Sequence, residues 1–331
     1  MNSVNPQKIS ERQTKINGLN INYKTIGEGK SPIVLLHGWG VDSERYLPLG
    51  KYLSEAQGSK LKAQSYCIYI LDLPGFGKSK EPKENWGLDD YVRLINKFVE
   101  NITRKKSGFE LVKNILKKKL EQYKHYDNMN YHSENEIAKN MILIGHSFGG
   151  RIAIKYAAKY PEKVDKLILT GAAGIKHKLT VKQKALFILT KIGKVFFSLP
   201  VINHFQKPVY NIFSKIARSR KKDYYNASSR MKEIMKNVLV EDLTDYLGKI
   251  KTPTLLVWGK EDKTTPLADG EIMKFKIQNS KLKVIEDANH SLPYQKAEEF
   301  ADIVLEFIEL QNVIARNPSE HSLQEGDAAI P

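Results

Sequence analysis

The chain has 331 residues, of which 41% are hydrophobic and 27% are charged. This length can bury one sizeable core, and it fits one large domain with an insertion better than two equal domains. A single cysteine, Cys67, excludes an internal disulfide framework. The polar start of the chain and the lack of a long uncharged apolar run exclude a signal peptide and a membrane span, so we expect a cytoplasmic protein.

The net charge of +16 is concentrated in two segments. Residues 171–250 hold 16 Lys and Arg against 5 Asp and Glu, and residues 101–140 hold 9 against 5, so the rest of the chain is close to neutral. A strongly basic protein often binds a polyanion. Here the charge belongs to two local segments without a recognised nucleic-acid-binding module, so we expect no nucleic-acid partner.

After a polar segment at residues 1–14, the chain shows the pattern of a β-hairpin. Asn17-Gly18 is a turn-forming pair, the apolar residues of 19–23 alternate with polar ones, and a further strand is expected at 33–36. Short apolar runs then alternate with helical patterns. The expected strands are 67–71, 141–144, 167–169, 255–258 and 282–285, and the clearest helical patterns span 151–160 and 297–310.

These strands are apolar throughout, which is typical of strands that helices cover on both faces. The sequence therefore predicts an α/β fold with a mostly parallel central sheet flanked by helices, formed by residues 15–171 and 252–312. Two stretches exceed an ordinary connection, namely a basic insertion at about 105–140 and residues 172–251, which are long enough to form a helical cap. Residues 313–331 are polar and aperiodic, and we expect them to be disordered.

The sequence Gly145-His146-Ser147-Phe148-Gly149 matches the G-x-S-x-G pattern of a nucleophile elbow. The pattern alone is a weak signal. Its context strengthens it, because an apolar strand runs directly into the motif and a helical pattern follows at once. The glycines allow the tight turn that holds a serine at a strained backbone angle. Ser147 is therefore the candidate nucleophile.

Four motifs in this order resemble the serine-nucleophile branch of the α/β-hydrolase family, over residues 15–310 apart from the two insertions. They are His37-Gly38-Trp39-Gly40, the run from Asp72 to Ser79, the elbow, and the run from Gly259 to Pro266 with Asn289-His290-Ser291. The resemblance implies an α/β-hydrolase fold with a cap and a catalytic triad of Ser147, Asp262 and His290. It also implies an oxyanion hole formed by the backbone N–H groups of Trp39 and Phe148.

The three triad residues have distinct chemical roles. A serine hydroxyl is a poor nucleophile near neutral pH, so Ser147 needs a base, and His290 could take its proton and later deliver it to the leaving group. Asp262 would fix the tautomer of His290 and stabilise its charged form. Glu261 is a competing candidate for the acid, and the family spacing to Pro266 favours Asp262.

Other motifs near these residues do not indicate a cofactor. His37 and His146 flank the candidate site and are interpreted as scaffold. Gly77-Lys78-Ser79 resembles the end of a phosphate-binding loop, but the required glycine five positions earlier is Asp72. The remaining histidines lack metal-ligand spacing. We expect neither a cofactor nor a metal.

The expected cap contains an amphipathic, basic helical pattern at 181–199, with apolar residues on one stripe and lysines largely elsewhere. The apolar stripe could close over the catalytic pocket, which favours a small-molecule substrate with an apolar acyl group. A second interpretation is that the basic helix contacts an anionic membrane surface.

A serine nucleophile, rather than an aspartate, argues against the dehalogenases and epoxide hydrolases of this family. The sequence therefore predicts a serine hydrolase that cleaves an ester or a related acyl bond through an acyl-enzyme intermediate. Two alternatives stay open: an acyltransferase that uses the same triad, and a ligand-sensing protein of this fold without turnover.

Overall fold

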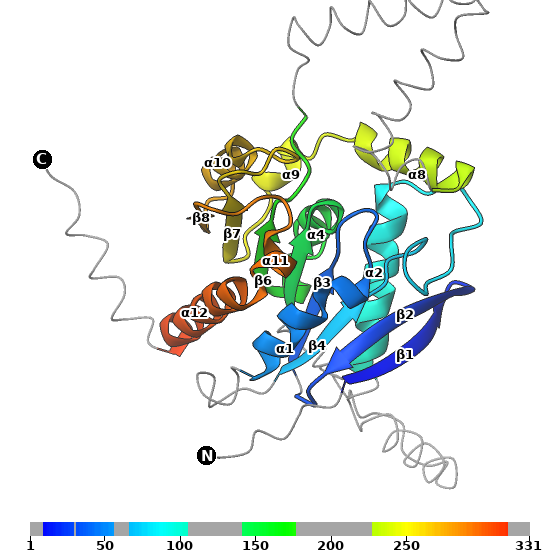
Figure 1. Ribbon diagram of the computed structural model, residues 1–331, viewed down its shortest axis with the longest axis horizontal. Helices are drawn as coiled ribbons and strands as arrows, with labels where there is room; N and C mark the ends of the chain where they lie inside the picture. Colours follow the sequence, from blue (N-terminus) through cyan, green and yellow to red (C-terminus); the bar gives the residue numbers. More distant parts are fainter. Residues whose placement is uncertain (1–8, 30, 56–65, 105–140, 177–226, 317–331) are drawn as a thin grey trace, which may run out of the picture.

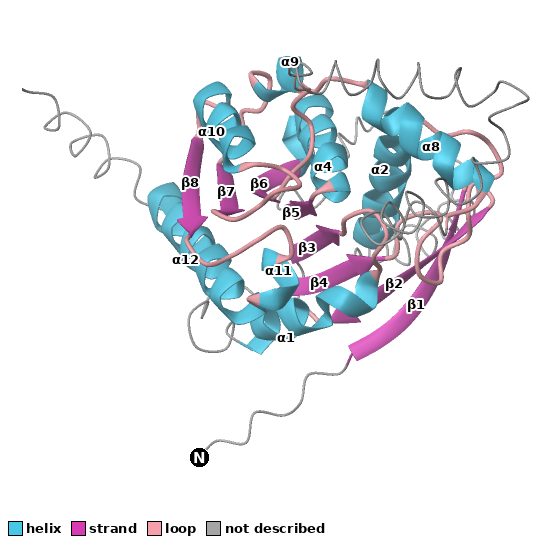
Figure 2. Ribbon diagram, turned by 45° about the horizontal axis from the view of Figure 1, so that its top comes forward, coloured by secondary structure: helices cyan, strands magenta, loops and turns pink. Residues whose placement is uncertain are grey.

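In the computed structural model, residues 9–29, 31–55, 66–104, 141–176 and 227–316 are described. They form an eight-stranded sheet with helices on both faces (Figures 1 and 2). The strands are β1 (Ile9–Ile16), β2 (Leu19–Ile26), β3 (Ser31–Leu36), β4 (Tyr66–Leu71), β5 (Met141–His146), β6 (Val164–Thr170), β7 (Thr254–Gly259) and β8 (Ser280–Ile285). The α-helices are α1 (Leu47–Glu55), α2 (Leu88–Arg104), α4 (Phe148–Lys159), α8 (Ser229–Val240), α9 (Thr244–Leu247), α10 (Leu267–Lys276), α11 (Leu292–Gln295) and α12 (Ala297–Arg316).

The strand order is β1-β2-β4-β3-β5-β6-β7-β8. Strands β1 and β2 form an antiparallel hairpin, and β2 also pairs antiparallel with β4. All pairs from β4 to β8 are parallel. The prediction of a mostly parallel sheet with antiparallel strands at its beginning is confirmed.

The central strands are apolar on both faces because each face meets a layer of helices. In β3, Val34 and Leu36 pack into the core beneath α2, α4 and α10, whereas Ile33 and Leu35 pack into the core beneath α1 and α12. Figure 2 shows these two helical layers on opposite sides of the sheet. Cys67 lies in the first core and is 5% exposed, as expected of a buried strand residue.

Two of the expected boundaries differ from the ends of the elements in the structure. Strand β1 begins at Ile9, so the polar segment predicted at 1–14 includes most of this strand. Because β1 is an edge strand, its backbone can pair with β2 while most of its side chains stay exposed, and it therefore needs no apolar run. At the other end, α12 continues to Arg316, past residue 312, where the folded core was expected to end.

The expected cap at 172–251 lies partly outside the described residues. The helical pattern at 181–199 and the basic insertion at 105–140 fall there, so both stay predictions, as does the membrane contact. Within the described part, Leu243, Leu247 and Ile250 are buried in the core cluster that contains α4 and α10. Met231, Ile234 and Val238 of α8 belong to the same cluster, so the buried core includes described residues of the segment that was expected to form the cap.

The parallel strands bring their carboxyl ends to one edge of the sheet, where ligands bind in folds of this kind. The segments that follow β3, β5, β7 and β8 at this edge carry the candidate site residues. Over the described residues, none of the helices combines the length and the apolar character that crossing a membrane requires.

Candidate active site

The turn between β5 and α4 holds Ser147 in a strained conformation. Its φ and ψ are 53° and −111°, a region that costs a residue with a side chain on the order of 1–3 kcal/mol. The Ser147 N–H donates to the carbonyl of Thr170, and the Ser147 carbonyl accepts from Ala173, so the neighbouring strand end holds the turn. A Cβ at Gly149 would lie 2.2 Å from the Leu36 carbonyl oxygen. Only glycine therefore allows the turn to approach β3 this closely.

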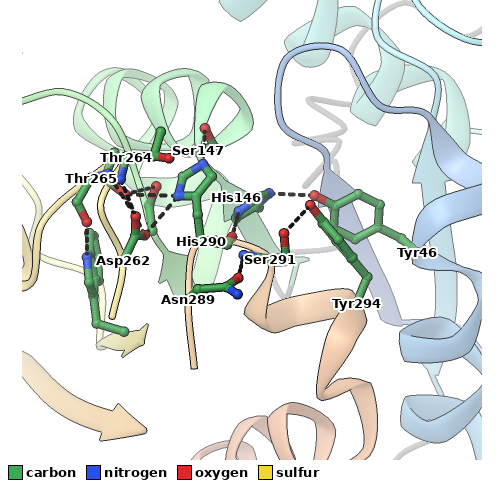
Figure 3. Close-up of polar contacts among 12 residues, drawn as sticks. Tyr46, His146, Ser147, Asp262, Thr264, Thr265, Asn289, His290, Ser291 and Tyr294 are labelled. Carbon is green, nitrogen blue, oxygen red and sulfur yellow. Dashed lines mark hydrogen bonds and ion pairs between the residues drawn. The ribbon is translucent and has the colours of Figure 1, made fainter. Parts of the chain in front are cut away.

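The loop after β8 brings His290 to Ser147. The His290 Nε2 atom lies 3.0 Å from Ser147 Oγ, within hydrogen-bond distance (Figure 3). The His290 side chain is 21% exposed, and Ser147 is neither fully buried nor fully exposed. The pair is thus accessible from the carboxyl edge of the sheet.

The loop after β7 supplies a buried carboxylate on the other side of the imidazole. Asp262 Oδ2 lies 2.8 Å from His290 Nδ1, and Oδ1 accepts hydrogen bonds from the backbone N–H groups of Thr264 and Thr265 at 2.8 and 2.9 Å. Burial by itself raises the pKa of Asp262, but the hydrogen bonds and the charge of His290 outweigh burial and hold this pKa below its usual value. Glu261, the competing acid, is exposed.

This geometry assigns the tautomer of His290. An ionised Asp262 only accepts hydrogen bonds, so His290 Nδ1 must carry the hydrogen. In the neutral imidazole, Nε2 then keeps its lone pair and can accept the hydroxyl hydrogen of Ser147. The structure brings the three predicted triad residues together in the arrangement that proton removal from Ser147 requires.

Thr265 and Gly171 complete the surroundings of the acid and were not singled out from the sequence. Thr265 Oγ1 lies 2.9 Å from both Asp262 Oδ2 and the Gly171 carbonyl oxygen, and 3.2 Å from His290 Nδ1. Gly171 has a φ of +47°, and a Cβ there would lie 3.0 Å from Asp262 Oδ2. The sequence feature that could have indicated a role for Thr265 is its position, three residues after Asp262 and directly before a proline.

The loop after β3 adjoins the nucleophile. The Gly149 N–H donates to the His37 carbonyl at 3.0 Å, and a Cβ at Gly38 would lie 3.3 Å from Ser147 Cβ. Within the described part of the chain, no group accepts a hydrogen bond from the backbone N–H of Trp39 or of Phe148. The role of these two groups as oxyanion donors stays a prediction.

Two buried histidines hold the loops around the site. His37 Nε2 accepts from the Leu73 N–H at 2.9 Å, and its Nδ1 lies 2.6 Å from the Gly38 carbonyl oxygen. His146 Nδ1 lies 2.5 Å from the Tyr46 hydroxyl, and its Nε2 lies 2.8 Å from the His290 carbonyl oxygen. Burial lowers the pKa of both histidines, that of His146 to about 3.

Aromatic side chains and a pocket lie beside the loop after β3. The Trp39 ring packs edge-to-face against Phe76 and Phe148, with centroid distances of 4.9 and 5.2 Å. A pocket of about 340 Å³ is lined by Trp39 and Phe76 together with the carboxylates Asp42 and Glu81. None of the described residues that line it is a lysine or an arginine.

The buried histidines predict a loss of stability in acid. Their folded-state pKa values lie below the value of about 6.5 in the unfolded chain. Below that pH the two histidines are therefore protonated in the unfolded state but stay neutral in the folded state. For His146 alone, the free energy of unfolding should fall by up to about 1.4 kcal/mol per pH unit between about pH 6.5 and its folded pKa. The lowered pKa of Asp262 acts in the same direction at lower pH.

Urea unfolding followed by tryptophan fluorescence at pH 7.5, 6 and 5 measures this loss. The variant His146→Gln lacks the titrating ring, so its stability should decline less steeply between pH 6.5 and 5 than that of the wild type. Equal slopes for the two proteins over this range would contradict the prediction.

Comparisons with known proteins concern the family and the fold of this chain. A sequence profile described as the alpha/beta hydrolase family matches residues 33–303. A 2-hydroxy-6-oxo-6-phenylhexa-2,4-dienoate hydrolase of Comamonas testosteroni is 25% identical to this chain, with 91% of the chain and 94% of the relative covered. A 2-hydroxy-6-oxononadienedioate/2-hydroxy-6-oxononatrienedioate hydrolase of Escherichia coli strain K12 is 24% identical, with 88% and 91% covered.

The fold is also found among solved structures. The esterase EaEST from Exiguobacterium antarcticum is 24% identical and superposes with a TM-score of 0.57, with 90% of this chain and 98% of that chain covered. The region matched by the family profile includes all five residues predicted to form the triad and the oxyanion hole.

Proposed function

Since this chain belongs to the α/β-hydrolase family and is a hydrolase of the serine class, we propose that it hydrolyses an ester or a related acyl bond, with Ser147, His290 and Asp262 as its catalytic triad. The observation that carries the proposal is the continuous chain of contacts from Ser147 Oγ to His290 Nε2 and from His290 Nδ1 to Asp262 Oδ2, at 3.0 and 2.8 Å. The reaction would pass through an acyl-enzyme intermediate.

In the first half of the reaction, Ser147 Oγ attacks the substrate carbonyl carbon while its proton moves to His290 Nε2. The imidazolium that forms is stabilised by the ionised Asp262. The carbonyl oxygen becomes an oxyanion, which the N–H groups of Trp39 and Phe148 would bind. One such donor contributes roughly 3–4 kcal/mol to the stability of the transition state.

The tetrahedral intermediate then collapses. His290 delivers its proton to the leaving alcohol, and the bond between the carbonyl carbon and the leaving oxygen breaks. In the second half, His290 removes a proton from water, which attacks the acyl group on Ser147. Return of the proton to Ser147 Oγ releases the carboxylic acid and restores the free enzyme.

A second candidate function is hydrolysis of a carbon–carbon bond beside a ketone, and the two relatives favour it. The substrate named for the Comamonas relative holds no ester, and its only carbonyl group besides the carboxylate is the 6-oxo ketone. Attack of water at that ketone therefore breaks a bond to carbon. A serine triad can form the same acyl-enzyme from such a ketone, with a carbon leaving group that must be protonated.

The charges beside the site favour an ester without a carboxylate over such a dienoate. The pocket next to Trp39 is lined by neither Ser147 nor His290, but a substrate carboxylate that extended into it would meet Asp42 and Glu81 and no cation among its described lining residues. Arg230 offsets part of the Glu81 charge, since its guanidinium lies 3.6 Å from that carboxylate. The proposed substrate is accordingly a neutral ester, and an apolar acyl group is consistent with the aromatic cluster of Trp39, Phe76 and Phe148.

Labelling with a fluorophosphonate probe tests the nucleophile. The wild-type protein and the control Ser229→Ala, which removes an exposed serine at the start of α8, should label, and Ser147→Ala should not. Labelling of Ser147→Ala at the wild-type rate would refute the assignment.

A substrate panel then separates the two reactions. We expect p-nitrophenyl esters to be hydrolysed with a kcat/KM at least about tenfold above that for 2-hydroxy-6-oxo-6-phenylhexa-2,4-dienoate, which corresponds to about 1.4 kcal/mol in the barrier. The opposite ranking would favour carbon–carbon hydrolysis. An ester panel with an added alcohol acceptor also tests acyl transfer, because transfer would convert the acyl group into a new ester.

A further inference from the structure

Two fully buried polar side chains, Tyr46 and His146, connect the loops that carry the proposed oxyanion donor and the proposed base. The Gly38 N–H donates to Tyr46 Oη at 3.3 Å, and this hydroxyl lies 2.5 Å from His146 Nδ1. His146 Nε2 lies 2.8 Å from the carbonyl oxygen of His290 (Figure 3). Gly38 directly precedes Trp39, and His146 directly precedes Ser147.

The partners of His146 fix the direction of every hydrogen bond in this series from Gly38 to His290. The His290 carbonyl oxygen can only accept, so His146 Nε2 must carry a hydrogen and donate it. The ring is neutral, in agreement with its lowered pKa, so Nδ1 must accept. Tyr46 therefore donates its hydroxyl hydrogen to Nδ1, which leaves its oxygen free to accept from Gly38. All four groups are satisfied in one arrangement.

Packing holds the same residues in place. Tyr46 and His146 are 0% and 3% exposed, and a buried hydroxyl or imidazole is costly unless it is hydrogen-bonded. The His146 ring packs against that of His290 with a centroid distance of 4.8 Å. Tyr294, whose hydroxyl donates to Ser291 Oγ at 2.9 Å, packs edge-to-face on Tyr46. The loop that carries His290 thus contacts this pair through its backbone, the His290 ring and Tyr294.

We propose that Tyr46 and His146 are positioning residues that fix the His290 loop and the Gly38-Trp39 loop in position relative to each other and to Ser147. Neither residue touches Ser147 Oγ in the hydrogen-bond chain, so they act through His290 and Gly38. This inference rests on the proposed function, because it assigns His290 as the base and Trp39 as an oxyanion donor. Shifts of about 1 Å in such groups can lower a rate on the order of 100-fold.

Four variants separate positioning from packing. Tyr46→Phe removes the hydroxyl and keeps the ring, and Tyr91→Phe is its matched control, because Tyr91 is equally buried and donates to the Pro74 carbonyl away from this chain. His146→Gln can keep a donor near the Nε2 position, toward the His290 carbonyl. His146→Asn keeps a polar atom near the Nδ1 position only.

The measurement is the second-order rate constant for fluorophosphonate labelling of Ser147, with kcat and KM for an ester and a thermal melting curve for each variant. We expect Tyr46→Phe and His146→Asn to lower the labelling rate and kcat by about 10- to 100-fold at nearly unchanged KM. We expect His146→Gln to retain most of the rate. Tyr91→Phe should label at the wild-type rate even if its melting temperature falls.

The outcomes distinguish the two proposals. If all folded variants label at the wild-type rate, or if His146→Gln loses as much rate as His146→Asn, the positioning role is overturned while Ser147 keeps its assignment. If the wild-type protein itself does not label at Ser147, the proposed function fails instead.

Discussion

Replacing Ser147 by alanine, replacing His290 by alanine, or replacing both should lower kcat for an ester by nearly the same factor, on the order of 10⁵- to 10⁶-fold. The reason is that the two side chains perform one step. Without Ser147 Oγ there is no nucleophile, and without His290 the hydroxyl 3.0 Å from its Nε2 atom keeps its proton. Once either group is lost, the other has nothing left to contribute.

The measurement is kcat for a p-nitrophenyl ester with each single variant and the double variant, with melting curves to show that all remain folded. The residual rate of all three proteins should lie above that of the buffer, because the proposed oxyanion donors, the N–H groups of Trp39 and Phe148, are unchanged in these variants. If the double variant loses the product of the two single factors, Ser147 and His290 act independently and the shared-step assignment is wrong.

The fold was predictable because the apolar runs and the turn residues are local signals. The apolar runs predicted at 141–144 and 255–258 lie within β5 and β7, whose carboxyl ends precede Ser147 and Asp262. Since parallel strands end at one edge of the sheet, the order of the motifs was sufficient to predict that these residues meet. The choice of Asp262 over Glu261 also agrees with their burial, because Asp262 is 5% exposed and Glu261 faces solvent.

Features that depend on contacts between distant segments were not predictable. Strand β1 has no apolar run, and only its pairing with β2 reveals it. The contact between Tyr46 and His146 spans 100 residues, and nothing in the sequence around Tyr46 indicates it. His146 was interpreted as scaffold, which agrees with its burial but omits its hydrogen bond to the base loop. Such contacts are set by packing of the whole core rather than by local pattern.

Replacing Asp262 by asparagine should lower kcat on the order of 10⁴-fold with little loss of stability. The asparagine oxygen can still accept hydrogen bonds from the N–H groups of Thr264 and Thr265, so the asparagine NH2 group would face His290. An amide donor next to Nδ1 requires Nδ1 to accept. The hydrogen of the neutral imidazole then moves to Nε2, where it points at Ser147 Oγ and prevents His290 from taking the hydroxyl proton.

Glu261→Gln is the matched control, since it makes the same change of charge one residue away on an exposed side chain, and it should keep kcat within about twofold of the wild type. Both variants are assayed with the same ester from pH 6 to 9. If kcat of Glu261→Gln falls as far as kcat of Asp262→Asn, the loss of negative charge near the site, rather than the tautomer of His290, limits the rate. If only kcat of Asp262→Asn falls, the defect comes from the loss of the carboxylate that contacts His290 Nδ1. The large loss then measures how much of the reactivity of Ser147 depends on which imidazole nitrogen carries the hydrogen.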